Sequence, residues 1–119
     1  MAEIRTIEKD HPEFSVHSMK RIGVVYVSTE RIVGTNSLNS WRFNDDWSPT
    51  VKGADSRWAN VLYETKKEGV IQKSKNGPIV LFKIGEDYYV ESDGNRRVSI
   101  AHMLRIPTVP AEVYELLRK

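Results

Sequence analysis

The clearest pattern along the chain is a change from helical to strand periodicity in its second half. Packing residues recur at i, i+3, i+4 and i+7 within 56–68, which predicts a helix with one buried face, and Gly69 is a natural stop. The apolar run Ile79–Ile84 then predicts a buried strand. Three polar residues that include Gly85 separate it from a return strand, Tyr88–Glu91, so the two runs predict a β-hairpin.

The flanking segments add a strand at each side and a second helix. Ile22–Val27 is β-branched and aromatic, which favours a strand, and Ser28–Val33 predicts a short turn of helix. Another helix is predicted to begin at Asp93–Gly94 and to stop at Pro107, and Ala111–Leu116 alternates like a strand. This order predicts a single α+β domain, a small mixed sheet with packed helices.

Residues 1–20 have no clear period. They carry scattered charge, and Ile4 and Ile7 are isolated apolar residues that could begin a short helix or an arm. We interpret 1–20 as an N-terminal extension, either a partly ordered tail or an arm that packs on a partner. The folded domain is then expected to span 21–119.

Gly34–Pro49 also lacks periodicity and predicts a long loop rich in Asn and Ser. It contains Trp41 and Trp47. Loops of this length are usually packed down by their own side chains or functional. We favour the packed interpretation, in which both tryptophans pin the loop.

Composition narrows the function classes. The chain has 119 residues, 39% hydrophobic and 29% charged, as expected for one compact domain. Lys plus Arg is 18 against 16 for Asp plus Glu, and a net charge of +2 does not by itself indicate nucleic acid. The absence of cysteine excludes disulfides and thiol catalysis.

Other exclusions concern metals and membranes. The three histidines, His11, His17 and His102, lack ligand spacing, so only carboxylates could form a metal site, and we expect none. No apolar run approaches the ~18 residues of a membrane span, and the N-terminus has no signal-peptide pattern. We expect a cytoplasmic protein with no membrane partner.

The candidate chemistry lies at the start of the second helix, in Asp93–Arg97, which we call the arginine turn. A helix start has open N–H donors, and two arginines in the first turn make an anion site plausible. Neighbouring helical residues diverge by roughly 100°, so only one arginine should face inward, and we expect Arg97. Asp93 is a candidate cap, and Ser99 is a candidate hydroxyl partner. The alternative, that Arg97 forks onto Asp93 and only braces the turn, is equally supported by these residues.

A second cationic feature is the cluster of Lys66, Lys67, Lys73 and Lys75. A solvated helix end and turn explains it better than contact with a phosphate backbone. The chain has no phosphate-loop motif, no Gly-x-Gly-x-x-Gly and no Gly-x-Ser-x-Gly. Catalytic residues therefore cannot be assigned from a motif.

The segments Pro78–Val90, Asp93–Ala101, Ile106–Pro107 and Ala111–Val113 together resemble the ParB/sulfiredoxin superfamily. The resemblance is to its stand-alone ParB-like nuclease domains, whose fold is that of the ParB N-terminal domain. Glu68–Gln72 resembles the segment that precedes the hairpin in those domains.

The resemblance implies a fold whose Gly-x-x-Arg turn holds the phosphates of CTP in ParB proteins, ATP in sulfiredoxin and ADP in a related serine kinase. Gly94 and Arg97 match that motif, and Arg42 resembles an upstream arginine of the ParB loop. The implied ligand is a nucleotide such as CTP or ATP, with Mg²⁺. The candidate phosphate-binding residues are Asp93, Gly94, Asn95, Arg96, Arg97 and Arg42.

Asn95 departs from the family pattern. It stands where sulfiredoxin has its nucleophile and where ParB proteins usually have glutamate, so a sulfiredoxin-type reductase is not expected. Three functions stay open. They are a nucleotide-binding module with weak hydrolysis, a DNA-binding protein or nuclease using the same arginines, and a non-enzymatic module that binds a protein partner or a second copy.

Overall fold

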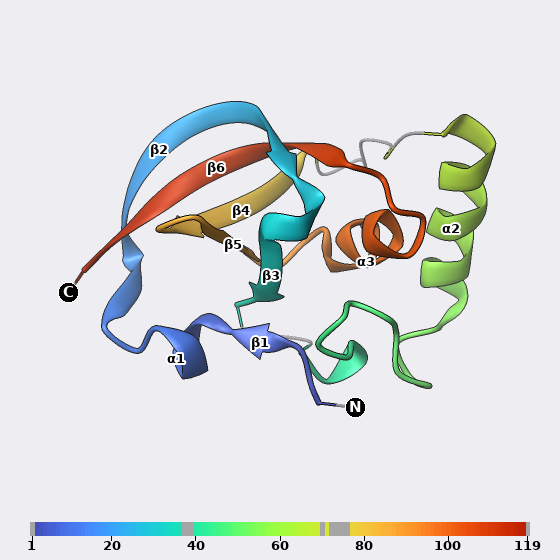
Figure 1. Ribbon diagram of the computed structural model, residues 1–119, viewed down its shortest axis with the longest axis horizontal. Coiled ribbons are helices and arrows are strands. Elements are labelled where there is room, and N and C mark those ends of the chain that lie inside the picture. The colour runs from blue at the N-terminus through green and yellow to red at the C-terminus, as the bar shows by residue number, and fades with distance from the viewer. Residues whose placement is uncertain (1, 37–39, 70, 72–76, 119) are drawn as a thin grey trace.

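The computed structural model of the protein describes residues 2–36, 40–69, 71 and 77–118. Within these residues six strands form one mixed sheet in the order β1-β3-β5-β4-β6-β2. The strands are β1 (Arg5–Thr6), β2 (Phe14–Ser28), β3 (Ile32–Thr35), β4 (Ile79–Ile84), β5 (Asp87–Val90) and β6 (Thr108–Arg118). The helices are α1 (Ile7–Asp10), α2 (Ser56–Glu68) and α3 (Asn95–Met103), with 3₁₀ turns η1 (Thr29–Arg31) and η2 (Ser40–Arg42). In Figure 1, α3 lies between the sheet and α2, and α2 packs on α3.

The predicted α+β class with a mixed sheet is confirmed, and the best-defined local elements are found where they were predicted. α2 spans Ser56–Glu68, and the Asp55 carboxylate caps it by accepting the amide of Trp58 at 2.9 Å. Gly69 ends it in the left-handed conformation with φ 76°. β4 and β5 form the predicted antiparallel hairpin.

Two segments of the first twenty residues, 5–6 and 14–20, are in the sheet. β1 pairs parallel to β3, and the side chains of Ile4 and Ile7 are buried. The domain boundary expected at residue 20 falls inside β2. Ile4 and Ile7 are isolated apolar residues in the sequence, without a periodic pattern around them. The sequence therefore could not show that they complete a core formed by distant segments.

The predicted loop Gly34–Pro49 is wrong at its start, because β3 includes Gly34. A Cβ on Gly34 would stand 2.3 Å from the carbonyl oxygen of Arg5 and 2.9 Å from the ring of Tyr89. The strand therefore needs glycine at this point so that β1 and β5 can approach it from both sides. When the neighbouring strands are not known, a glycine after a short apolar run suggests the start of a loop.

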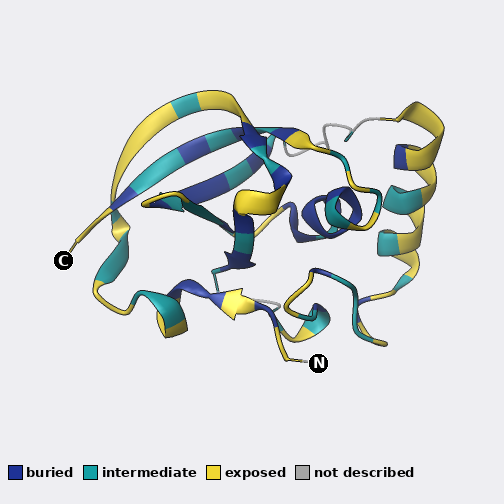
Figure 2. Cartoon of the chain, in the orientation of Figure 1, coloured by how far each residue is buried: buried dark blue, intermediate teal, exposed yellow. Residues whose placement is uncertain are grey.

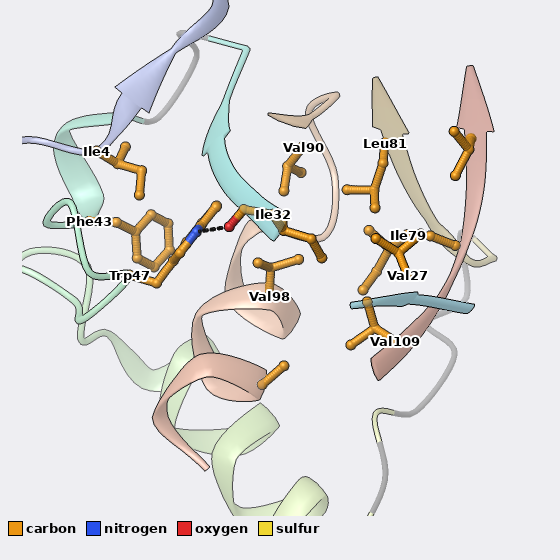
Figure 3. Close-up of a cluster of buried hydrophobic side chains, with 13 residues drawn as sticks. Ile4, Val27, Ile32, Phe43, Trp47, Ile79, Leu81, Val90, Val98 and Val109 are labelled. Atoms are coloured by element: carbon orange, nitrogen blue, oxygen red, sulfur yellow. Dashed lines mark hydrogen bonds between the residues drawn. The ribbon is translucent and has the colours of Figure 1, made fainter. Parts of the chain in front are cut away.

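Trp47 is the largest side chain of the core and Trp41 is not part of it. Trp47 is 1% exposed, its ring lies 5.5 Å from that of Phe43, and its indole N–H donates to the carbonyl of Ile32 at 2.8 Å. Figure 3 shows this bond between the loop and β3. Trp41 is 49% exposed and lies against the guanidinium of Arg42. The prediction that tryptophans pin the loop is confirmed for Trp47 and wrong for Trp41.

The N-terminal segment is tied to the sheet by Asp10. The hydroxyl of Tyr89 and the Nε of Arg5 each donate to the Asp10 carboxylate at 2.7 Å. Burial would raise the pKa of this carboxyl, but the hydrogen bonds from Tyr89 and Arg5 outweigh it and hold its pKa below the usual range. Burial and the bond to Asp10 raise the pKa of Tyr89, so Tyr89 stays a donor at physiological pH.

This arrangement predicts acid sensitivity. Because the pKa of Asp10 is lower in the folded state than its ordinary value of 3.8, its contribution to stability is present above about pH 4 and disappears as pH falls through the folded pKa. Asp10→Asn should lower the urea midpoint at neutral pH, and the difference from the wild type should shrink in acid. Glu8→Gln removes an exposed carboxylate of the same helix and is the matched control. A difference that persists unchanged in acid would contradict this assignment.

Candidate functional site

The arginine turn joins β5 to α3 and depends on Gly94. Gly94 has φ 110°, a conformation that L side chains rarely adopt, and no side chain caps the helix start. A Cβ there would stand 3.2 Å from the side chain of Ile79 and 3.5 Å from Nη2 of Arg97. The first amides of α3 have no side-chain cap, and Nη2 of Arg97 lies near Gly94.

Arg97 is the inward arginine, as predicted. Its residue is 6% exposed, and its Nη1 donates to the carbonyl of Gly77 at 3.1 Å. Its Nη2 lies 3.6 Å from a carboxylate oxygen of Asp93 and is buried with no hydrogen-bond partner among the described residues. Burial lowers the pKa of this guanidinium, and Asp93 only partly opposes the effect. The turn thus holds a buried cation with a donor that no described residue satisfies by a hydrogen bond.

Asp93 does not cap α3, and that prediction is wrong. Its carboxylate is 59% exposed and pairs with Arg97 instead. Asn95 braces the turn, since its Nδ2 donates to the carbonyl of Ser92 at 3.0 Å. The Oδ1 of Asn95 is buried without a hydrogen-bond partner among the described residues, so a donor on a ligand would find an acceptor there.

Arg96 turns away from Arg97 and meets Arg42 at a shared carboxylate. Asp55 Oδ2 lies 3.2 Å from Nη2 of Arg96 and 3.4 Å from Nη1 of Arg42, while its Oδ1 caps α2. The amide of Trp58, and then Arg96, lower the pKa of Asp55, so it is ionised at neutral pH. Both arginine side chains are about a quarter exposed, and their Nε atoms have no hydrogen-bond partner among the described residues.

The structure therefore brings Arg42 next to α3, 54 positions before Arg96 in sequence. The link between the two arginines is Asp55, the residue that caps α2. A capping carboxylate uses one oxygen to accept a helix amide, and its second oxygen can still bind a cation. This is the one sequence feature that could have indicated Asp55 as a partner of the arginines. The helix start thus has two charged groups: Arg97 pairs with Asp93, while Arg96 and Arg42 share Asp55, which leaves the second group with one positive charge in excess.

Gly53 positions Arg42, which gives a prediction. A Cβ at Gly53 would stand 1.9 Å from the carbonyl oxygen of Arg42, and that oxygen also accepts the amide of Thr50 at 2.9 Å. Gly53→Ala should force the Arg42 backbone to move and lower the free energy of unfolding by roughly 1–3 kcal/mol. Urea unfolding measures this, with Val51→Ala as the control because Val51 is 96% exposed. An unchanged urea midpoint for Gly53→Ala would show that the backbone around Arg42 and Gly53 adjusts without a loss of stability.

Ser99 is buried in the core, and His102 is half-buried and packs against the core. The Ser99 hydroxyl donates to the carbonyl of Trp47 at 2.6 Å and accepts the indole N–H of Trp58 at 3.0 Å, so its proposed role as a ligand partner is wrong. His102 stacks on Trp47 and contacts the carbonyl of Ile32 at 3.1 Å, and burial lowers its pKa. Both residues hold α3 against the loop.

The remaining candidates add little to the site. Lys66 and Lys67 lie in the last turn of α2, while Lys73 and Lys75 lie outside the described residues. No group of three or more histidine, aspartate or glutamate residues is gathered for a metal ion within 2–36, 40–69, 71 and 77–118. No helix in the same ranges is long and apolar enough to cross a membrane.

The fold and this site define an α+β domain with an arginine-bearing helix start beside a mixed sheet. No family model matches the chain, and a search of curated proteins finds no match in sequence. In structure it is similar to sulfiredoxin from Arabidopsis thaliana, with a TM-score of 0.48 and 19% identity, covering 76% of this chain and 82% of that chain. It is also similar to a conserved hypothetical protein from Pyrococcus furiosus, with a TM-score of 0.50 and 15% identity, covering 81% of this chain and 34% of that chain.

This chain thus spans about a third of the Pyrococcus furiosus protein. Both similarities are of the fold alone. Neither similarity says what this chain binds.

Proposed function

We propose that the arginine turn binds the phosphate groups of a nucleotide. The observation that carries the proposal is the buried guanidinium of Arg97, whose Nη2 has no hydrogen-bond partner among the described residues and lies beside Gly94. Since a buried donor without a partner costs about 1–3 kcal/mol, an anion that satisfies it gains that amount back. The uncapped amides of α3 provide donors of the same kind.

Arg96 and Arg42 support a ligand with more than one phosphate. They share one oxygen of Asp55 at 3.2 and 3.4 Å, so neither forms the two-bond fork that arginine makes with a dedicated carboxylate. A second phosphate group would offer each of them further acceptor oxygens. Mg²⁺ would then be held mainly by the phosphates of the ligand, as is usual for this ion.

We propose binding with slow hydrolysis at most. Asn95, at the start of α3, has an amide that cannot accept a proton as a general base, and its Nδ2 is committed to the carbonyl of Ser92. A phosphate-release assay with ATP and CTP is expected to give turnover well below the 1 s⁻¹ that marks the low end of typical enzymes, about 10⁻² s⁻¹ or less. Faster turnover would assign catalysis to a group other than Asn95.

Calorimetric titration tests the proposal directly. ATP, CTP and GTP are titrated with and without Mg²⁺, and pyrophosphate is titrated to isolate the phosphate contribution. We expect binding that weakens as salt is raised and a ligand-dependent rise in Tm. No heat and no change in Tm with any of these ligands at about 1 mM would refute the proposal.

DNA binding is the alternative that uses the same arginines. It is separated from nucleotide binding by a gel shift with duplex DNA across a salt series and by plasmid cleavage with divalent metal. Salt-dependent binding of DNA without binding of free nucleotides would favour the alternative. Binding of nucleotides without a gel shift would favour the proposal.

A further inference from the structure

The carboxylate of Asp55 lies where three elements meet: the turn η2, the start of α2 and the first turn of α3. Figure 2 shows α3 coloured mainly as buried and α2 mainly as exposed or intermediate. The side chains of Asp55, Arg42 and Arg96 fall between these extremes, at 34%, 25% and 28% exposed. Water therefore screens the charges of this group only in part.

The two oxygens of Asp55 have separate partners. Oδ1 accepts the amide of Trp58 at 2.9 Å and so caps α2, whereas Oδ2 accepts from Nη2 of Arg96 at 3.2 Å and from Nη1 of Arg42 at 3.4 Å. The Nε atoms of both arginines are buried, and no described residue accepts a hydrogen bond from them. The carboxylate thus holds the two arginines without satisfying all their donors.

Asp55 occupies the position in which a ligand anion would meet Arg96 and Arg42. Arginine binds a phosphate as it binds a carboxylate, by hydrogen bonds from the guanidinium to oxygens that carry negative charge. Because Asp55 belongs to the same chain, it meets the arginines at a high effective concentration. A ligand group must displace this carboxylate to bind both arginines, so it needs more charge and more oxygens than a carboxylate has. A phosphate group meets this requirement, with three acceptor oxygens and a charge of about −2.

We propose that Asp55 is an internal competitor of the ligand, and that the second phosphate group of a bound nucleotide displaces its Oδ2 from Arg96 and Arg42. Oδ1 stays on the amide of Trp58, so α2 keeps its cap when the ligand binds. Asp55 then lowers the affinity of the site for polyphosphates, and only a strongly charged group gains contact with both arginines. The inference rests on the phosphate binding proposed above and assigns a residue that opposes it.

Asp55→Asn tests the competition, because it removes the negative charge and keeps a side chain that caps helices as well as aspartate does. Calorimetric titration with pyrophosphate and with ATP and Mg²⁺ measures Kd for the wild type and the variant. We expect Asp55→Asn to bind both ligands about three- to thirtyfold more tightly, the range for a partly screened unit charge beside the ligand. If Asp55 only held the arginines in place, its loss would weaken binding. Unchanged or weaker binding by folded Asp55→Asn would overturn the proposal.

Two further variants control for charge and for folding. Asp45→Asn removes the same charge from an exposed position of the loop that carries Arg42, and it should change Kd less than about twofold. Asp55→Ser also keeps a capping oxygen and removes the charge, so it should tighten binding as Asp55→Asn does. Tm is measured for each variant to show that it is folded. Equal tightening by Asp45→Asn would overturn the proposal, since the effect would then come from net charge alone.

A double-mutant cycle with Arg42→Ala separates displacement from a general repulsion of anions. In the wild type, Arg42 exchanges Asp55 for the ligand, so Arg42→Ala should weaken binding of pyrophosphate only slightly. In Asp55→Asn, the contact of Arg42 with the ligand replaces no carboxylate, so the same substitution should raise Kd by a factor at least about threefold larger. An equal effect in both backgrounds would show that Asp55 acts on the ligand only by long-range repulsion, and it would overturn the proposed displacement.

The same titrations distinguish this inference from the proposed function. Binding by the wild type without tightening in Asp55→Asn would refute the role of Asp55 and leave the phosphate site in place. No binding of pyrophosphate or ATP by either protein would refute both. Binding that is detected only in Asp55→Asn would support both, because an internal competitor is expected to mask the site.

Discussion

Replacing Arg97 with alanine is expected to weaken binding of ATP or pyrophosphate by about ten- to a hundredfold, because hydrogen bonds to charged groups contribute roughly 1.5–3 kcal/mol. The effect should be large since the guanidinium is buried beside Gly94 and has a donor with no hydrogen-bond partner among the described residues. Arg97→Lys should recover part of the loss, because it keeps the charge but not the planar fork. Calorimetry measures the change in Kd.

The control separates a lost contact from a lost charge. Arg57→Ala removes the same charge from an exposed position of α2 and should change Kd less than about twofold. Arg97 also donates to the carbonyl of Gly77, so the Tm of Arg97→Ala is measured to show that the variant is folded. A folded Arg97→Ala protein with unchanged Kd would assign Arg97 to bracing the turn alone.

Replacing Trp47 with alanine is expected to lower the free energy of unfolding by about 3–5 kcal/mol, a large part of the stability of a domain of this size. The substitution leaves a cavity beside Phe43 and His102 and removes the indole donor to Ile32. Trp47 has φ 71°, so its packing also compensates for a backbone conformation that is rare for a bulky residue. Urea or thermal unfolding measures the change.

Trp41→Ala is the matched control for this prediction. Trp41 is half exposed and lies against Arg42, so its loss should cost only the roughly 0.5–1 kcal/mol of an exposed cation–π contact. Equal destabilisation by the two substitutions would contradict the assignment of Trp47 to the core and of Trp41 to the surface. Loss of ligand binding in Trp41→Ala without loss of stability would instead connect Trp41 to the site through Arg42.

Several elements could be predicted from the sequence because their causes are local. α2 has a capping carboxylate at its start, a periodic face and a glycine at its end, all within 55–69. The hairpin β4–β5 follows from two apolar runs and a short polar turn. The arginine turn is also local, and the divergence of Arg96 and Arg97 follows from helix geometry alone.

The other features depend on segments that are distant in sequence. Gly34 can be recognised as a strand residue only once β1 and β5 are known to lie beside it. Likewise, Ile4 can be recognised as a core residue only once the segments that surround it are known. Trp41 and Trp47 are equivalent in the sequence, and only the tertiary structure distinguishes them by placing Ile32 within reach of one indole.

At the site, the sequence alone determined a helix start with Gly94 and two adjacent arginines, because turn chemistry and helical geometry act over a few residues. The tertiary structure decided that Arg42 joins them through Asp55, and that Asp93 pairs with Arg97 instead of capping α3. It also decided that β2 is an edge strand, since strand order is set by long-range packing. Local patterns specify elements, whereas contacts between elements decide which side chains share a site and which backbone groups stay open.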